Sequence, residues 1–148
     1  MSRAERAKEY FLQGCACSQA VVLAFSDLIA LSEEESKKIM LPFGGGLGRL
    51  RLTCGAVSGM AAVIGMLYAE SENNPENKKN VYAIVQELCG KFQQQTGSLI
   101  CAELLQKKNV PVEVGGEAEA RTKEYYQKRP CGDMIALAAQ ILEEYIGK

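Results

Sequence analysis

The sequence predicts an all-α protein, a single helical domain over residues 1–148 built as a bundle around a buried central helix at about residues 53–69. The first observation is the uncharged stretch from Thr53 to Tyr68, because a helix that is apolar on every face belongs inside a fold. The second is that apolar residues recur at helical spacing elsewhere, while no segment alternates as a strand does. The third is the length, since 148 residues suit one domain that buries roughly 70% of the unfolded surface.

Two helices are expected in the first thirty residues. The first covers residues 3–13, where apolar side chains return every three or four positions, and Gly14 ends it. The second begins at Cys17 and runs over residues 19–31, whose wide apolar face predicts that it is largely buried.

A capping box marks the start of the third helix. Ser32 is followed by three glutamates ending at Glu35, so that acids occupy the first turn. The helix is expected to run to about Met40, because Pro42 stops it. The glycine-rich run at residues 43–49 then forms a loop.

The central helix carries small residues along one side. Thr53 is its expected N-cap, and Gly55, Gly59 and Ala62 follow at spacings that let a neighbouring backbone approach closely. The uncharged run of residues 52–69 has the minimum length of a membrane span. Its three glycines, cysteine, threonine and serine favour a buried helix over a membrane span.

The second half of the chain predicts further helices around one irregular segment. A long helix is expected at about residues 76–95, and a shorter one at 98–105. Residues 109–116 contain a proline and two glycines, so they are expected to be irregular. A polar helix at about residues 117–128 follows, and the last helix begins at Cys131 behind a proline.

Charge and composition exclude several function classes. The net charge is −1, from 17 basic and 18 acidic side chains, so neither nucleic acid nor an anionic membrane is an expected partner. The N-terminal segment lacks the apolar core of a signal peptide, which predicts a cytoplasmic protein with mostly reduced thiols. There is no histidine, which excludes a serine–histidine–acid triad and the usual haem ligand. Six cysteines in this setting indicate redox chemistry or metal binding.

Four of the six cysteines share one predicted position, the first turn of a helix. Unpaired N–H groups and the helix macrodipole favour negative charge there, and hence a thiolate. The alternative for each is that free cysteine serves as a small buried apolar residue. The four are Cys17, Cys54, Cys101 and Cys131.

The segments around these cysteines resemble a known family. CSQAVVLAF begins at Cys17, TCGAVSG contains Cys54 behind FGGGLGR, SLICAELL contains Cys101, and Cys131 follows late in the chain. Together they are similar to the redox-active bacterial and archaeal proteins labelled C_GCAxxG_C_C, over about residues 17–146. The resemblance implies a helical domain whose four matching cysteines act in redox chemistry or electron transfer.

The sequence departs from the family pattern at the second cysteine. The pattern has glycine before that cysteine and glycine four residues after it, whereas Thr53 precedes Cys54 and Gly59 lies five residues later. Cys15 and Cys89 lie outside the pattern, and we interpret them as incidental.

Two kinds of chemistry suit four converging thiolates. Four sulfurs around one point suit zinc or an iron–sulfur cluster, and two pairs of sulfurs suit thiol–disulfide exchange. The cysteines are about thirty to fifty residues apart, so the fold must assemble either site. At least two of the four sulfurs are then expected to lie within reach of a disulfide or a shared metal.

The resulting functional hypothesis is thiol–disulfide exchange or electron transfer through the four cysteines, with an electron donor or acceptor protein as partner. A thiol oxidoreductase is compatible with it, and so is a homo-oligomer. One alternative is a non-catalytic protein that binds metal or an iron–sulfur cluster through the same cysteines. Another is a helical interaction module whose cysteines only fill the core.

The glycine-rich loop has two interpretations. The N–H groups of Gly44, Gly45, Gly46 and Gly48 would suit an anionic cofactor, with Arg49 completing the site. No strand precedes the loop and no phosphate-loop lysine follows it, so a nucleotide is not expected. We favour a structural turn that brings the loop over the cysteines. For Arg49 a surface ion pair and a role in lowering a thiol pKa both remain open.

Cys54 is the expected attacking thiol. Arg49 and Arg51 precede it within five residues, and together with the helix N-terminus they favour the thiolate and lower its pKa. Burial of the central helix acts in the opposite direction, because desolvation raises a thiol pKa. The expectation therefore requires that the glycine loop leaves the first turn open.

Overall fold

The computed structural model describes residues 1–148, and all of its regular secondary structure is helical apart from one isolated antiparallel bridge between Thr53 and Ile100. The all-α prediction is confirmed. In chain order the elements are α1 (Arg3–Leu12), α2 (Cys17–Leu23), α3 (Glu33–Met40), the 3-10 helix η1 (Leu41–Phe43), α4 (Gly44–Leu47), α5 (Gly55–Tyr68), α6 (Pro75–Thr96), α7 (Cys101–Lys107), α8 (Lys123–Lys128) and α9 (Cys131–Ile146).

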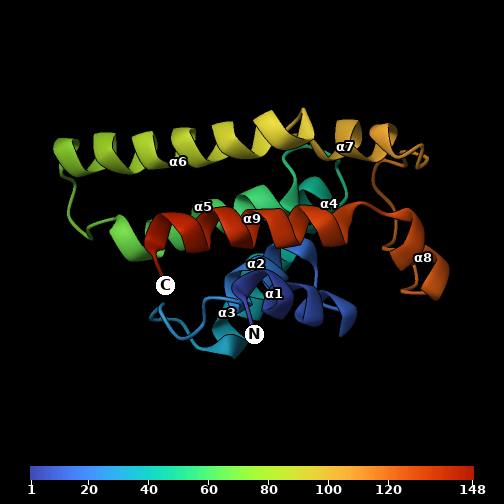
Figure 1. The fold of residues 1–148 in the computed structure, drawn as a ribbon, viewed down its shortest axis with the longest axis horizontal. Helices are drawn as coiled ribbons and strands as arrows, with labels where there is room; N and C mark the ends of the chain where they lie inside the picture. Colours follow the sequence, from blue (N-terminus) through green and yellow to red (C-terminus); the bar gives the residue numbers. More distant parts are fainter.

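Helix α5 is the element around which the others are arranged. It packs against α2, α6 and α9, and its start also contacts η1 and α4. Figure 1 shows α5 and α9 side by side in the middle of the molecule, with α6 along one side and α1, α2 and α3 on the other. The prediction of a central helix in this region is therefore confirmed, although its last turn at residues 66–68 is only partly buried.

Local sequence signals explain most of the helix ends. Ser32 accepts a hydrogen bond from Glu35 N, and the Glu35 carboxylate accepts one from Ser32 N, which is the capping box expected from the sequence. Asn74 caps α6 ahead of Pro75, and Gly97 ends that helix in a left-handed conformation.

Two predicted helices are shorter than expected. Helix α2 stops at Leu23, and the chain then turns because Arg3 Nη1 donates to the carbonyl of Ala24 at 2.8 Å. The helix expected at residues 117–128 is confined to α8, because Thr122 caps it by accepting from Tyr125 N. In both cases a long-range contact or a cap overrides a continuous apolar or polar pattern.

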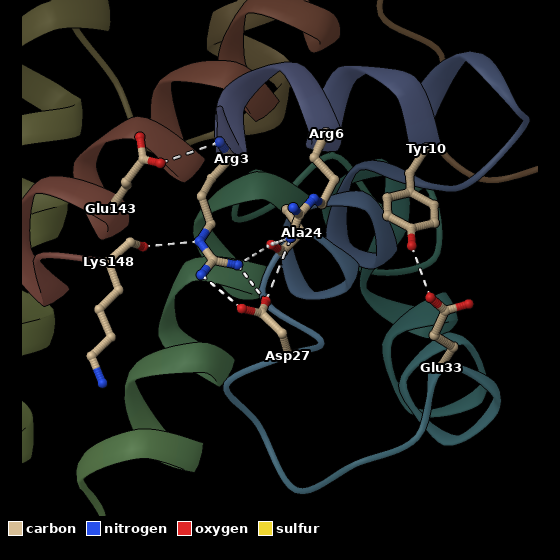
Figure 2. A network of polar contacts seen from close by, with 8 residues as sticks. All are labelled: Arg3, Arg6, Tyr10, Ala24, Asp27, Glu33, Glu143 and Lys148. Atoms are coloured by element: carbon tan, nitrogen blue, oxygen red, sulfur yellow. Dashed lines mark hydrogen bonds and ion pairs between the residues drawn. The ribbon is translucent and has the colours of Figure 1, made fainter. Parts of the chain in front are cut away.

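An ion pair between a buried arginine and a half-exposed aspartate joins both ends of the chain to the turn after α2 (Figure 2). Arg3 is 8% exposed, and its guanidinium donates to both carboxylate oxygens of Asp27, at 2.5 and 3.0 Å. Arg3 Nε also donates to the carbonyl of Lys148, and Arg3 N donates to the carboxylate of Glu143 on α9. The network therefore fixes α1 against α9 and the turn at Asp27.

No helix in the structure is long and apolar enough to cross a lipid bilayer.

Candidate functional site

Side chains from distant parts of the sequence line one cavity of about 320 Å³. All four cysteines of the predicted site take part in it. The fold therefore brings together thiols that the sequence separates by about thirty to fifty residues. The four are Cys17, Cys54, Cys101 and Cys131.

Each of these cysteines lies where a helix begins, as the sequence predicts. Cys17, Cys101 and Cys131 are the first residues of α2, α7 and α9. Cys54 is itself the N-cap of α5, so the prediction of Thr53 as the cap was wrong by one residue. The reason is that the backbone before α5 is held in an extended bridge, with Cys54 N donating to Leu99 O at 2.8 Å and Cys101 N donating to Leu52 O at 2.6 Å.

The glycine loop passes directly over the start of α7. A Cβ atom on Gly46 would lie 2.7 Å from Cys101 Cβ, which is too close for any side chain. Gly46 also has a φ of +71°, in the left-handed region that favours glycine. The interpretation of the loop as a close structural turn over the cysteines agrees with this geometry. Of the loop residues proposed for an anionic cofactor, Gly44, Gly45, Gly48 and Arg49 line the cavity, and Gly46 is buried behind it.

Arg51 is the positive group closest to a cysteine sulfur. It is 5% exposed, and its Nη1 lies 3.8 Å from Cys101 Sγ, within hydrogen-bond range for sulfur. Arg51 Nε donates to the carbonyl of Glu113 at 2.9 Å, which fixes the guanidinium in place. Arg51, which together with Arg49 was expected to lower the pKa of Cys54, therefore lies against the Cys101 sulfur instead.

Arg49 holds the irregular segment that follows α7 against the cavity. Its guanidinium donates to the carbonyl of Glu117 and lies 3.6 Å from the carboxylate of Glu113. Gly115 N donates to the carbonyl of Arg49 at 2.8 Å. Of the two roles left open by the sequence, the structure supports the ion pair. Arg49 Nε is nevertheless buried without a hydrogen-bond partner.

Two further arginines complete the wall around Cys131. Arg121 donates to the carbonyls of Phe11 and Cys15, and its guanidinium lies 4.6 Å from the centroid of the Phe11 ring. Arg129 pairs with the carboxylate of Glu119 and is 6% exposed at its side chain. Contacts with aromatic rings, and for Arg129 with a carboxylate, therefore hold both guanidinium groups at the cavity wall.

Burial controls the protonation of the thiols. It raises the pKa of the Cys17 thiol, and the Gly45 N–H opposes that rise. Burial and, to a smaller extent, negative charge on Cys17 and Cys101 raise the pKa of Cys131 to about 12, although Arg129 and Arg121 oppose the rise. Both residues keep some exposed surface in the cavity, but protein atoms around their sulfurs remove most of the water.

The expected low pKa of Cys54 was wrong. Cys54 is 7% exposed, and burial followed by repulsion from Cys17 places its pKa well above the ordinary value. The N–H groups of Ala56 and Val57 lower it, as a helix start should, although the neutral side chain forms no capping hydrogen bond. The desolvation of the buried helix outweighs these dipoles.

The arrangement places no three cysteine or acidic side chains where they could hold one metal ion. All six cysteines are free thiols. Cys15 and Cys89 do not line the cavity, which agrees with their interpretation as incidental. The four cavity thiols would need to move to share a metal.

The sequence did not point to the residues that line the cavity opposite the glycine loop. For Arg129 the sequence offered one signal of a place in the site, because this residue lies two residues before Cys131. Arg121, Glu119 and Tyr125 had none, because they reach the site only through the packing of α8 against α1.

Comparison with known proteins identifies one family. A family model described as "Putative redox-active protein (C_GCAxxG_C_C)" matches residues 15–145, which include all four cavity cysteines. No curated protein and no solved structure matches the chain. Because the family model covers most of its length, the protein belongs to the C_GCAxxG_C_C family.

Proposed function

We propose that the protein carries out thiol–disulfide exchange, with the four cavity cysteines as its redox-active groups. The observation that carries this proposal is that four thiols from four helix starts line one cavity. Thiol–disulfide exchange requires only two sulfurs in contact at each step, and small movements of neighbouring thiols can supply that contact.

Cys101 is the attacking thiol in this proposal. A thiolate is the nucleophile in disulfide exchange, and Arg51 Nη1 lies 3.8 Å from Cys101 Sγ, where it can pair with the thiolate during attack. Burial holds the neighbouring thiols of Cys17, Cys54 and Cys131 in the neutral form.

Cys17 is the proposed resolving thiol. The Gly45 N–H lowers the pKa of Cys17, while a Cβ atom on the next residue of the same loop, Gly46, would lie 2.7 Å from Cys101 Cβ. The two cysteines therefore lie against consecutive glycines, and negative charge on Cys101 raises the pKa of Cys17. Formation of a disulfide between Cys17 and Cys101 would pass the two electrons of the dithiol to the substrate, and Cys54 and Cys131 would form the second pair.

The test is a count of free thiols with mapping of the disulfides formed. Fully reduced protein is treated with a small disulfide, quenched in acid and digested for mass spectrometry. We expect thiols to disappear in pairs, beginning with Cys17–Cys101, and Cys101→Ser to remove the fast phase. Cys89→Ser is the matched control and should leave that phase unchanged, because Cys89 lies outside the cavity.

The metal-binding alternative predicts a different outcome of the same experiment. Protein purified without oxygen would contain stoichiometric zinc, or iron with sulfide, and the four thiols would react only after a chelator removed the metal. That result would replace thiol exchange with a metal or iron–sulfur role for the same cysteines.

A further inference from the structure

The cavity around the cysteines is lined by more positive than negative side chains. Four arginines face it and a single glutamate, Glu119, opposes them. We propose that the substrate bound there is a small organic disulfide that carries carboxylate groups. This inference rests on the proposed thiol–disulfide exchange and names its substrate class. The four arginines are Arg49, Arg51, Arg121 and Arg129.

Several guanidinium N–H groups remain available to a bound anion. Arg49 Nε is buried without a hydrogen-bond partner, which is costly unless a ligand accepts from it. Arg51 uses Nε and Nη1 in hydrogen bonds, so its Nη2 remains free to donate. Planar guanidinium groups held in this way match the two oxygens of a carboxylate.

Neighbouring acids neutralise only part of this charge. Glu119 pairs with Arg129, and both lie at the cavity wall. The Glu113 carboxylate is 3.6 Å from Arg49 but 74% exposed, so water screens this pair strongly. Because burial keeps Cys17, Cys54 and Cys131 neutral, these thiols add no negative charge at neutral pH.

Size and lining restrict the substrate further. A volume of about 320 Å³ is at the lower end for small-molecule sites, so the cavity admits a short molecule. The apolar side chains of Phe11, Leu104, Leu105 and Met134 also line it, and they suit the methylene groups between a disulfide and its carboxylates.

The reaction balances without a further reagent. The Cys101 thiolate attacks one sulfur of the substrate, the substrate S–S bond breaks, and the departing thiolate takes up the proton that Cys101 has lost. Cys17 then gives up its proton and its thiolate attacks Cys101 Sγ, which breaks the mixed disulfide, and the second substrate thiolate leaves and takes up that proton. Two protein thiols are oxidised to one disulfide, and the substrate disulfide is reduced to two thiols.

The test compares three disulfides with identical two-carbon arms that differ only in their end groups. Dithiodipropionate ends in carboxylates, hydroxyethyl disulfide in hydroxyls, and cystamine in ammonium groups. Loss of thiols in the reduced wild-type protein is followed under pseudo-first-order conditions. Each rate is then divided by the rate at which the same disulfide reacts with free mercaptoethanol, which corrects for its intrinsic reactivity. We expect the carboxylate compound to react fastest, by on the order of tenfold over the neutral one, and the ammonium compound to react slowest.

Arginine variants test the source of this preference. Arg49→Gln and Arg129→Gln should each reduce severalfold the ratio of the rate with the carboxylate disulfide to the rate with the neutral disulfide. Arg6→Gln is the matched control, because Arg6 pairs with Asp27 far from the cavity and should leave the preference intact. Added salt should also reduce the preference in the wild-type protein.

A non-reactive ligand separates this inference from the proposed function. Suberate has the shape of dithiodipropionate with methylene groups in place of sulfur, and its binding to the wild-type protein can be measured by calorimetry. Equal rates for the three disulfides, without suberate binding, would overturn carboxylate recognition and leave thiol exchange standing. Suberate binding without protein oxidation by any of the disulfides would overturn thiol exchange, and with it the disulfide as substrate.

Discussion

The sulfur of Cys17 occupies the space that a side chain on Gly55 would need. A Cβ atom on Gly55 would lie 2.3 Å from Cys17 Sγ and 3.0 Å from the carbonyl oxygen of Phe43. The start of α5 therefore meets the start of α2 with no free volume between them, and both starts belong to the cysteine cavity.

Gly55→Ala should destabilise the protein by about 1 to 3 kcal/mol, because the new methyl group displaces the Cys17 sulfur and nearby backbone. Urea unfolding of the reduced protein measures the change. Combining it with Cys17→Ala should recover part of the loss, since that substitution removes the closest atom. Gly90→Ala is the control, because its Cβ would meet nothing within 4 Å on α6. A stability loss that Cys17→Ala does not reduce would contradict the contact.

Gly59→Leu should also cost about 1 to 3 kcal/mol or more through overpacking. A Cβ on Gly59 would lie 2.9 Å from the Ser18 carbonyl oxygen and 3.0 Å from Val21 Cβ. Gly65→Leu on the same helix is the matched substitution, because nothing lies within 4 Å of its Cβ position. Thermal unfolding of both variants checks this. Equal melting temperatures would mean that α2 does not pack closely on α5 at Gly59.

Stability should fall above about pH 8.5, the ordinary pKa of a thiol in the unfolded chain. Burial raises the folded-state pKa values of Cys17, Cys54 and Cys131, so the folded state retains protons that the unfolded state loses. The contribution of these thiols to the free energy of unfolding is complete below about pH 8.5. It is lost as the pH rises towards the pKa of each thiol in the folded state, which is about 12 for Cys131. Each thiol contributes a slope of about 1.4 kcal/mol per pH unit in that window.

Urea unfolding between pH 7 and about pH 10.5, with a reductant present, measures that slope. Cys131→Ser should make it shallower, since a hydroxyl does not ionise there. An unchanged slope in this variant would show that the Cys131 thiol is solvated in the folded protein.

Alkylation should modify Cys101 first and Cys54 much more slowly. Arg51 lies beside the Cys101 sulfur, whereas Cys54 is 7% exposed and its pKa is raised by burial. Mass spectrometry of each cysteine after brief treatment with iodoacetamide gives the rates. Arg51→Gln should slow Cys101 without changing the rate at Cys89. Faster modification of Cys54 than of Cys101 would restore Cys54 as the attacking thiol.

Arg3→Ala should destabilise the fold by about 1 to 3 kcal/mol, because it removes the hydrogen bonds that a buried guanidinium donates to Asp27, Ala24 and Lys148. Arg3 holds the pKa of Asp27 below its usual range, so that part of the stability is present above about pH 4 and lost as the pH falls through the folded pKa. Asp27 is half exposed, and Asp27→Asn should cost only about 0.5 to 1 kcal/mol. Urea unfolding at pH 7 and pH 3 tests both, and identical acid sensitivity in wild type and Asp27→Asn would contradict the pairing.

The sequence by itself determined the all-α class, the central helix and the common position of four cysteines. Uncharged residues from Thr53 to Tyr68 cannot be covered except by other helices, so α5 had to be central. Capping chemistry at Ser32 and the proline before Cys131 similarly fixed the starts of α3 and α9. These signals are local, so they start a helix regardless of how the rest of the chain packs.

Only the tertiary structure decided which charges and which burial each cysteine experiences. Arg51 is three residues from Cys54 in sequence, yet the bridge between Thr53 and Ile100 directs its guanidinium to Cys101. Arg121 reaches the cavity only because α8 packs on Phe11, which no local pattern indicates. Desolvation depends on every atom around a sulfur, and those atoms come from distant segments. The starts of α3 and α9 could therefore be predicted from the sequence, whereas the choice of attacking thiol required the fold.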